Sequence, residues 1–395
     1  MKRIIVLLAA FAMVGAAVAT ASAAVDLYGS VRFRTYYNNY NGDATGGTSY
    51  GTTEWKNDGL TRLGMNFKSG DITGKWEIDA ATTAANYDQK GHGGADRGQM
   101  RLRLAYGVWN FGSGSLLIGQ DFPLTDYYVT SIYHTDNGLQ GWGGLGITQA
   151  RVAQMKLQFG GLRFAAITPY TSIDPVTPSG VGSINAYLPK LEVRYDGKVG
   201  NGFNYMLVGG FQTYQANRYS VGGDGNSANI LSYVLAAAFK YNYKALTLSA
   251  LAKYAQNAGN YGLCFGNPAS GFQTFGSVNG VGNRADRAHV YGGGSVDNAK
   301  QWGALVSVGY KFSDLLSLET GYGYVQNWND GGNYGYHDDG QAAYLQARFT
   351  VAPGVFIVPE FIYYDAMKSK NASSGYYSKD GALTTFGIMW RIDFK

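Results

Sequence analysis

The sequence lacks any apolar run, after its first 23 residues, that approaches the ~18 residues of a transmembrane helix. It has a single cysteine, Cys264, so no disulfide can form within the chain. Charged residues make up only 15% of the chain, and the formal net charge is +5. Such a weak surplus does not suggest nucleic acid as a partner. These absences exclude a helical membrane protein and leave two possibilities, a soluble exported protein or one that crosses a membrane by another route.

The sequence also lacks the motifs of common enzymes. It contains no Gly-x-Ser-x-Gly elbow and no His-Glu-x-x-His helix, and its four histidines are scattered over expected loops. We therefore predict that the protein is not an enzyme and uses no cofactor. The run His337-Asp338-Asp339 has donors for a divalent cation, but a solvated polar loop is the interpretation we favour, and we predict no metal site.

The first 23 residues have the organisation of a secretory signal. Lys2 and Arg3 form a charged start, Ile4–Ala19 is apolar and rich in alanine, and Ala21-Ser22-Ala23 fits the small-residue cleavage rule. We predict cleavage of residues 1–23, which leaves a single domain at 24–395. Loss of Lys2 and Arg3 lowers the net charge from +5 to +5 − 2 = +3.

Glycine and tyrosine are abundant, in contrast to cysteine and charge. The chain has 57 Gly, 32 Tyr and 7 Trp, and its mean hydropathy is −0.18. This hydropathy is too polar for a helical membrane protein, and the aromatic content is high for a soluble domain. Strands that alternate between lipid-facing and lumen-facing residues average to such a value.

Alternation with a period of two residues runs through the chain. In Val25–Tyr37 the odd positions Val25, Leu27 and Val31 are apolar, whereas the even positions include Asp26, Arg32 and Arg34. Such a pattern indicates strands with one face in an apolar medium and one in a polar medium. We predict sixteen strands, at 25–37, 60–68, 74–82, 99–109, 115–120, 149–159, 161–168, 187–196, 203–214, 230–242, 245–256, 301–312, 315–327, 340–351, 355–365 and 382–394.

The links between these strands are alternately short and long. Short links fall at 69–73, 111–114, 159–161, 197–202, 242–244, 313–314 and 352–354, and each is flanked by long ones such as 38–59, 121–148 and 257–300. A closed up-and-down barrel with turns on one rim and loops on the other has this arrangement, and an even strand number lets the first and last strands pair. We therefore predict an all-β fold, a 16-stranded antiparallel transmembrane β-barrel.

Aromatic residues on the apolar faces gather near strand ends. Because tyrosine and tryptophan prefer the interface between lipid and water, membrane barrels carry two aromatic girdles. The alternative is ordinary aromatic packing in a β-sandwich. The girdle residues are expected to be Tyr106, Tyr195, Phe203, Tyr205, Tyr241, Tyr310, Phe312 and Phe394 near turns, and Tyr37, Tyr254 and Tyr363 near loops.

With sixteen strands, alternating links and a long third loop, the chain resembles the trimeric general porins of Gram-negative outer membranes. The resemblance covers the mature chain as architecture and is strongest in Tyr106–Gln120, a strand, turn and short strand ending in Gly119-Gln120. Residues 150–168 resemble the strand pair that follows. The Pro-Glu-Phe-Gly-Gly-Asp loop motif of enteric members is absent, and the chain ends Phe394-Lys395 rather than on the aromatic residue. A branch outside the enteric lineage would explain both differences.

The resemblance implies an outer-membrane homotrimer in contact with lipid, with subunit contacts on the outward faces of the early strands. It implies short periplasmic turns, long extracellular loops, and a water-filled channel for ions and small hydrophilic solutes, with the third loop folded into the pore. The constriction is then expected to lie between acids of that loop and bases of the first four strands. The acids are Asp121, Asp126 and Asp136, and the bases are Arg32, Arg34, Arg62, Lys75, Arg101 and Arg103. Six bases against three acids predict a weak preference for anions.

Other functions stay open at this point. Tyr127, Tyr128, Tyr133 and Trp142 in the third loop would suit a saccharide-selective channel, although such residues more often pack a loop against a wall. A barrel that serves as an adhesin or hydrolase is a further alternative, and a soluble secreted β-protein is a remote one. The sequence does not assign a role to Cys264 or to the loop at 257–300.

Overall fold

A computed structural model of the chain describes residues 24–41, 49–81, 99–134, 138–141, 145–171, 181–218, 227–263, 286–290, 295–329, 336–370, 377–379 and 381–395. The expected signal, residues 1–23, lies outside the described residues, so its cleavage and the domain boundary at Ala24 stay predictions.

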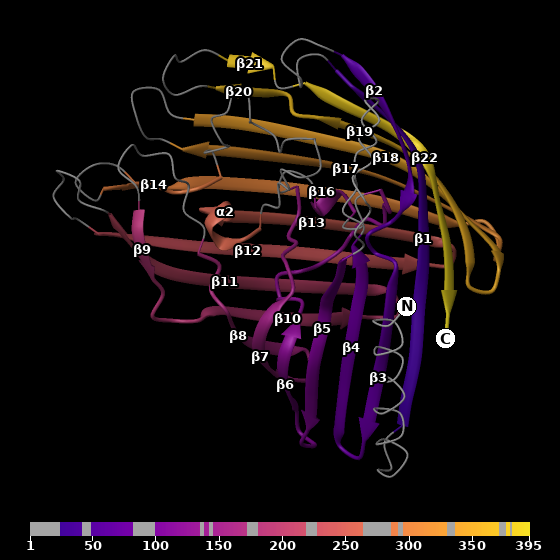
Figure 1. Cartoon of the computed structure of the whole chain (residues 1–395), viewed down its shortest axis with the longest axis horizontal. Coiled ribbons are helices and arrows are strands. Elements are labelled where there is room, and N and C mark those ends of the chain that lie inside the picture. Colours follow the sequence, from indigo (N-terminus) through magenta and orange to yellow (C-terminus); the bar gives the residue numbers. More distant parts are fainter. Residues whose placement is uncertain are drawn as a thin grey trace, which may run out of the picture.

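Sixteen antiparallel strands form one closed sheet (Figure 1). The second and the eighth are each interrupted and consist of two segments. The strands are β1 (Ala24–Tyr40), β2 (Tyr50–Asn57) with β3 (Arg62–Ser69), β4 (Ile72–Ala81), β5 (Gln99–Asn110), β6 (Ser115–Asp121), β7 (Val152–Phe159), β8 (Leu162–Ile167), β9 (Val181–Asn185) with β10 (Lys190–Val199), β11 (Phe203–Arg218), β12 (Ser227–Tyr243), β13 (Leu246–Gln256), β16 (Ala299–Lys311), β17 (Leu316–Asn329), β18 (Tyr336–Ala352), β19 (Val355–Asp365) and β22 (Ala382–Phe394).

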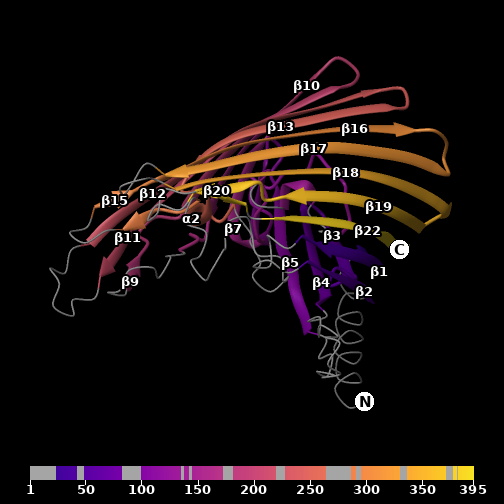
Figure 2. The same ribbon diagram turned by 90° about the horizontal axis from the view of Figure 1, so that it is seen from above.

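The first and last strands close the barrel. β1 pairs with β22 in an unbroken register from Gly29 opposite Phe394 to Tyr40 opposite Leu383. Both views show the two strands side by side, and the turns that join neighbouring strands gather at the same end as the C-terminus (Figures 1 and 2). Pairing of the first strand with the last means that the barrel itself, in the part of the chain described, has no edge strand. The predicted 16-stranded antiparallel barrel is confirmed.

The long links contain more ordered structure than the sequence indicates. Residues 50–57 extend the second strand as β2, and the break that follows is an Asx turn, in which the Asp58 carboxylate accepts the Leu60 N–H at 2.9 Å. His337 lies in β18 and not in a loop as expected. The remaining short elements are a 3₁₀ helix η2 (Leu139–Gly141), α2 (Ala258–Tyr261), β14 (His289–Val290), β15 (Val296–Asp297), β20 (Lys368–Lys370) and β21 (Tyr377–Lys379).

The helices described in the structure are all too short, or not apolar enough, to span a membrane.

Strand faces alternate between exposed apolar residues and buried ones. In β16, Val306 and Val308 are 49% and 43% exposed, whereas Leu305 is fully buried. A soluble barrel would bury its apolar face, so large exposed apolar side chains at every second position mark a surface that meets lipid. Most expected girdle residues are exposed on this outward face: Tyr37, Tyr195, Phe203, Tyr241, Tyr310, Phe312, Tyr363 and Phe394.

One strand changes face partway along its length. β5 carries a bulge, because Ile78 pairs with Leu102 and Glu77 with Leu104, which leaves Arg103 as the extra residue. An extra residue reverses which side chains point outward from there on. Trp109 is consequently exposed, whereas Tyr106 lies opposite the inward-facing Lys75. The prediction that Tyr106 belongs to the outer girdle was therefore wrong, and Leu104, which regular alternation from the exposed Met100 and Leu102 would place outward, is buried.

Candidate functional site

The third long link, which we call loop 3 (residues 122–151), folds into the barrel and packs on its inner wall. It is described at 122–134, 138–141 and 145–151. Six of its aliphatic side chains are at most 7% exposed, namely Leu124, Val129, Ile132, Leu139, Leu145 and Ile147. They share one apolar cluster with wall residues such as Leu251, Leu305 and Ile362. Burial of six such side chains contributes on the order of 10 kcal/mol before the entropy of ordering the loop is subtracted. The predicted inward fold is confirmed.

Three wall carboxylates bind backbone N–H groups of loop 3. Glu192 on β10 accepts the Thr125 N–H at 3.0 Å, and Glu319 on β17 accepts the Ser131 N–H at 2.8 Å. Glu360 on β19 accepts the N–H groups of Tyr133 and His134 at 2.7 and 3.0 Å. A hydrogen bond to a charged group is stronger than one between neutral groups, so these three carboxylates fix the path of the loop across the bore.

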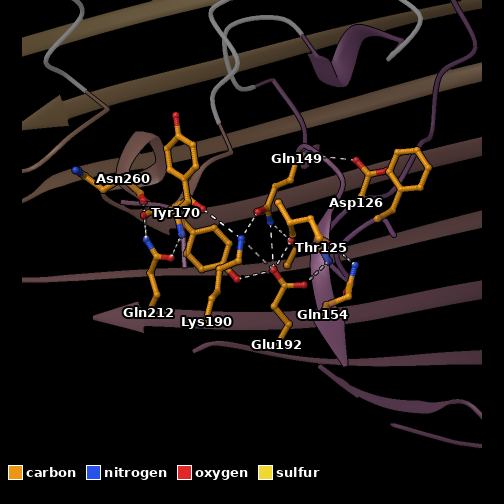
Figure 3. Close-up of polar contacts among 12 residues, drawn as sticks. Thr125, Asp126, Gln149, Gln154, Tyr170, Lys190, Glu192, Gln212 and Asn260 are labelled. Carbon is orange, nitrogen blue, oxygen red and sulfur yellow. Dashed lines mark hydrogen bonds and ion pairs between the residues drawn. The ribbon is translucent and has the colours of Figure 1, made fainter. Parts of the chain in front are cut away.

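Glu192 is the centre of a buried polar cluster (Figure 3). One of its carboxylate oxygens accepts hydrogen bonds from the Thr125 hydroxyl at 2.8 Å and from the Gln149 amide at 3.2 Å. Lys190, which is 2% exposed, lies 3.9 Å from the same carboxylate and donates to the side-chain amide oxygen of Gln149. Both ends of loop 3 are thus tied to β10 by one acid and one base.

A second chain segment enters the bore beside loop 3. Residues 257–263 are buried throughout, although they begin the longest link of the chain. The Tyr261 hydroxyl donates to Glu192 at 2.8 Å, and the Gln212 amide donates to the Asn260 carbonyl at 2.6 Å. The sequence assigned no role to this link, and its first seven residues pack inside the barrel.

Four of the six predicted bases lie on β3–β5, where each strand turns its polar face inward. Arg103 is buried, with Nε 2.7 Å from Glu77 and Nη1 3.0 Å from Asp79. Arg101 is half exposed and makes two bonds to Asp79 at 3.0 and 3.1 Å. Arg62 lies opposite Asp79 in the strand pairing, and the ammonium of Lys75 on β4 sits 4.9 Å from the ring of Tyr28.

The other two predicted bases lie on β1. Arg34 donates to Asp58 at 2.7 Å, so the Asx turn that ends β2 also positions this guanidinium. Arg32 is 5% exposed, and its guanidinium carbon lies 5.7 Å from the ring of Tyr133 at the tip of loop 3.

Both of the predicted acids that the structure describes, Asp121 and Asp126, are held by partners. Asp121 forms an ion pair with Lys156 at 2.7 Å. Asp126 accepts hydrogen bonds within loop 3, from the Thr148 hydroxyl at 2.7 Å and the Gln149 N–H at 3.1 Å. Burial raises the pKa of Asp126 to about 6 despite these bonds. Asp136 lies outside the described residues.

Sequence reasoning missed Arg151, the last residue of loop 3. Its guanidinium carbon lies 5.2 Å from the ring of Phe122, and no described acid pairs with it. Its pKa is lowered first by burial and next by the positive charge of Arg103, with a further contribution from Arg62. Loop 3 therefore presents a base toward the basic strands. Its position directly before an alternating strand was the available signal.

Among the described residues, no group of three or more His, Cys, Asp or Glu side chains is arranged to hold a metal ion.

By sequence, neither a protein-family model nor a curated protein matches the chain. By structure, it is similar to the outer membrane channel DcaP of Acinetobacter baumannii, with a TM-score of 0.62, 20% identity, and coverage of 94% of this chain and 97% of that one. It is also similar to the anion-selective porin of Comamonas acidovorans, with a TM-score of 0.55, 13% identity, and coverage of 94% and 100%.

The trimer form of OmpT, an outer membrane protein of Vibrio cholerae, gives a TM-score of 0.54 at 15% identity, with 94% of this chain and 99% of that one covered. At these identities the likeness concerns the fold. The chain has the fold of the bacterial outer-membrane porins, a closed 16-stranded antiparallel β-barrel.

Proposed function

We propose that the protein is a passive outer-membrane channel that admits ions and small hydrophilic solutes. Support comes from the outward face, which carries large apolar side chains at alternate positions, and from a bore lined by charged ones. Barrels of this strand number enclose a water-filled channel. Loop 3 narrows that channel from the side of β10–β19 and leaves the polar faces of β3–β5 across from it.

The channel is proposed to prefer anions. The main support is the position of Arg151, which adds a base of loop 3 to the bases of β3–β5. At the constriction this residue joins Arg62, Lys75, Arg101 and Arg103. The acids there are Glu77 and Asp79, both already bound to arginines, and Asp126, whose pKa burial raises to about 6. Asp121 is neutralised by Lys156. A surplus of positive charge in a narrow water column between low-dielectric walls attracts anions over a long range. The Comamonas acidovorans structure shows that a similar fold carries anion selectivity.

The assembly is proposed to be a homotrimer in the outer membrane, as in the OmpT trimer. The outward faces of the early strands supply the contact, because Leu63 and Ile72 are 37% and 57% exposed there and Met100 is 66% exposed. Cross-linking of detergent-extracted protein tests this, and a monomer under all mild detergents would contradict it.

Planar-bilayer recording of the purified protein tests the channel. A passive channel gives stepwise currents that are proportional to voltage and rise with salt concentration. Absence of any conductance would favour an adhesin or a hydrolase with a filled bore. Currents blocked in a saturable manner by sugars would favour a saccharide-selective channel.

The saccharide alternative has little support from the described aromatic residues. Tyr127 is covered by Arg194 at 4.9 Å, and Tyr133 is flanked by Arg32 and Arg391 at 5.7 and 5.6 Å. Tyr128 is the member of the set with a larger exposed area, at 40%. Trp142 lies outside the described residues. Rings that already stack on arginines do not present a continuous apolar track to a sugar.

A further inference from the structure

Two arginines face each other across the strand pair that closes the barrel. Arg32 on β1 lies directly opposite Arg391 on β22 in the pairing register. Directly opposed side chains in an antiparallel pair have Cβ atoms about 5 Å apart, and like charges there are destabilising. Asp393 compensates part of this charge, because it binds Arg391 and interacts electrostatically with Arg32, and the Arg32 Nε donates to the Ser30 hydroxyl at 3.4 Å.

A third arginine extends this pair along the wall. Phe356 on β19 is the register partner of Arg391, and its ring lies 4.2 Å from the guanidinium carbon of Arg348 on β18. The guanidinium carbon of Arg391 lies 5.5 Å from the same ring. Arg32, Arg391 and Arg348 thus form a lateral row on the inner wall, which we call the arginine row.

Aromatic rings, and not only carboxylates, hold the arginine row in place. Tyr133 of loop 3 lies between Arg32 and Arg391, at 5.7 and 5.6 Å from their guanidinium carbons, and its hydroxyl accepts a bond from Arg391 at 3.0 Å. Stacking on a ring face fixes the plane of a guanidinium group. Its N–H groups stay in that plane and can still bind a planar or tetrahedral oxyanion beside the ring.

The described carboxylates near the row leave Arg348 without an acid partner. Asp393 binds Arg391 through two bonds of 2.7 Å. No described acid pairs with Arg348, and its buried Nε has no hydrogen-bond partner. Glu360 lies four residues along β19 from Phe356, about 13 Å away, and its oxygens are occupied by Tyr36, Gln346 and two loop 3 N–H groups. Glu319, on β17, is likewise bound to Ser131 and Tyr344.

The row lies between loop 3 and the turn rim. Arg391 is three residues from the end of β22, and Arg348 is four residues from the end of β18 at the short turn to β19. Arg391 retains 21% of its side-chain exposure, and Arg348 is partly exposed. Solutes that pass loop 3 toward the turns therefore meet these guanidinium groups.

We propose that Arg348, Arg391 and the Tyr133 hydroxyl, with Arg32 buried behind them, form a binding site for a small oxyanion, such as a sulfate, phosphate or carboxylate group, on the turn side of loop 3. This site rests on the proposed channel function and makes it more specific, since the anion preference then includes a saturable binding step. Arg348 supplies the guanidinium group with free N–H donors. Arg391, held in place by Tyr133 and Asp393, supplies the second positive charge of the site.

Sulfate block of chloride current tests the site. In bilayers bathed in potassium chloride, added sodium sulfate should reduce wild-type chloride conductance along a saturating curve. The half-blocking concentration should rise at least about tenfold in Arg348→Gln, because a charge-assisted hydrogen bond is worth about 1.5–3 kcal/mol and 1.4 kcal/mol is tenfold. Arg348→Lys keeps the positive charge but loses the paired N–H donors of the guanidinium group. Its half-blocking concentration should lie between those of wild type and Arg348→Gln.

Arg163→Gln is the matched control. This arginine is on β8, also near the turn rim, and lies 3.5 Å from Asp196, outside the arginine row. Its half-blocking concentration should stay within about twofold of wild type. Equal shifts in Arg163→Gln and Arg348→Gln, or a block that never saturates, would overturn the site and leave the channel standing. Absence of chloride conductance in the wild type would instead overturn the proposed channel itself.

Discussion

The hydroxyl of Tyr261 donates a 2.8 Å hydrogen bond to the carboxylate oxygen of Glu192 that also accepts the hydroxyl of Thr125 at 2.8 Å. One acid on β10 therefore holds two inward-folded segments that are more than a hundred residues apart in sequence. Its only basic neighbour in the described cluster is Lys190, at 3.9 Å. Loss of this acid should affect both segments at once.

Glu192→Ala should lower barrel stability by about 3–5 kcal/mol, because it leaves Lys190 buried without its counter-charge. Glu192→Gln, which keeps an acceptor, should cost about 1–3 kcal/mol. The temperature at which folded protein converts to unfolded on detergent gels measures this, and open-channel current noise should rise with the loosened loop. Asp314→Asn, at an exposed turn acid, is the control and should match wild type. Equal stability of all three variants and wild type would refute the anchoring role.

The bulge at Arg103 predicts which residues of β5 face water. In a Cys264→Ser background, Tyr106→Cys should react with a charged, membrane-impermeant thiol reagent that enters the bore. Ala105→Cys, one residue earlier and paired with the outward-facing Trp76, should stay unreactive in lipid. The opposite pattern would mean that inward and outward side chains alternate without interruption along the whole of β5.

Gly119 is expected to tolerate no side chain. Its φ is +134°, and a Cβ atom there would lie 2.2 Å from the Ala105 carbonyl oxygen and 2.7 Å from the Tyr106 Cα. Gly119→Ala should cost at least about 2 kcal/mol through strain and forced strand separation. Gly107→Ala is the control, since its nearest contact would be the Thr73 carbonyl at 4.0 Å. Equal yields of folded protein for both variants would show that β6 adapts without cost.

His134 should make loop 3 sensitive to acid. Burial, aided by the charge of Arg34, lowers the pKa of His134 to about 4, and neither ring nitrogen has a hydrogen-bond partner. When loop 3 leaves the wall, His134 regains its ordinary pKa near 6.5. Between pH 6.5 and 4 the released histidine therefore binds a proton that the histidine packed against the wall does not. Docking therefore weakens as pH falls through this window, by up to about 3 kcal/mol, and changes no further below pH 4.

The measurement is the protease sensitivity of loop 3 from pH 7.5 to 4, with His134→Phe as the comparison. This variant keeps a ring against Tyr36, which His134 contacts at 4.8 Å between ring centroids. It should lose the weakening of loop 3 at low pH and keep only the opposite effect of Asp126, whose raised pKa favours the docked loop as pH falls. An identical pH response in both proteins would contradict the role of His134.

The barrel could be predicted from the sequence because its two causes are local. The alternation in Val25–Tyr37 shows that one face of the strand meets an apolar medium and the other a polar one. The alternately short and long links show which strand ends lie on the turn rim and which on the loop rim. The parity change in β5 could not be predicted, because the bulge at Arg103 depends on how that strand pairs with Glu77 and Ile78. A one-residue register shift leaves no trace in the composition of a single strand.

The candidate site could be predicted only in part. The bases on the first strands follow from strand alternation. Arg34 and Arg101 bind Asp58 and Asp79, Arg62 lies opposite Asp79, and their place at a constriction stays a prediction. The carboxylates that hold loop 3, Glu192 and Glu360, come from strands far along the chain, and only the closed barrel brings them together. Arg348 and Arg391 were missed for the same reason. Their proximity depends on the pairing of β18, β19 and β22, not on any sequence motif.

The reversal potential across a potassium chloride gradient tests the central claim most directly. The wild-type channel should be anion-selective, and Arg151→Gln should shift its reversal potential toward the cation side, because one base at the constriction is lost. Asp126→Asn should change wild-type selectivity little at pH 5, where this carboxyl, with a pKa of about 6, is largely protonated, and more at pH 7.5. A cation-selective wild type, or a reversal potential unmoved by Arg151→Gln, would contradict the proposed constriction.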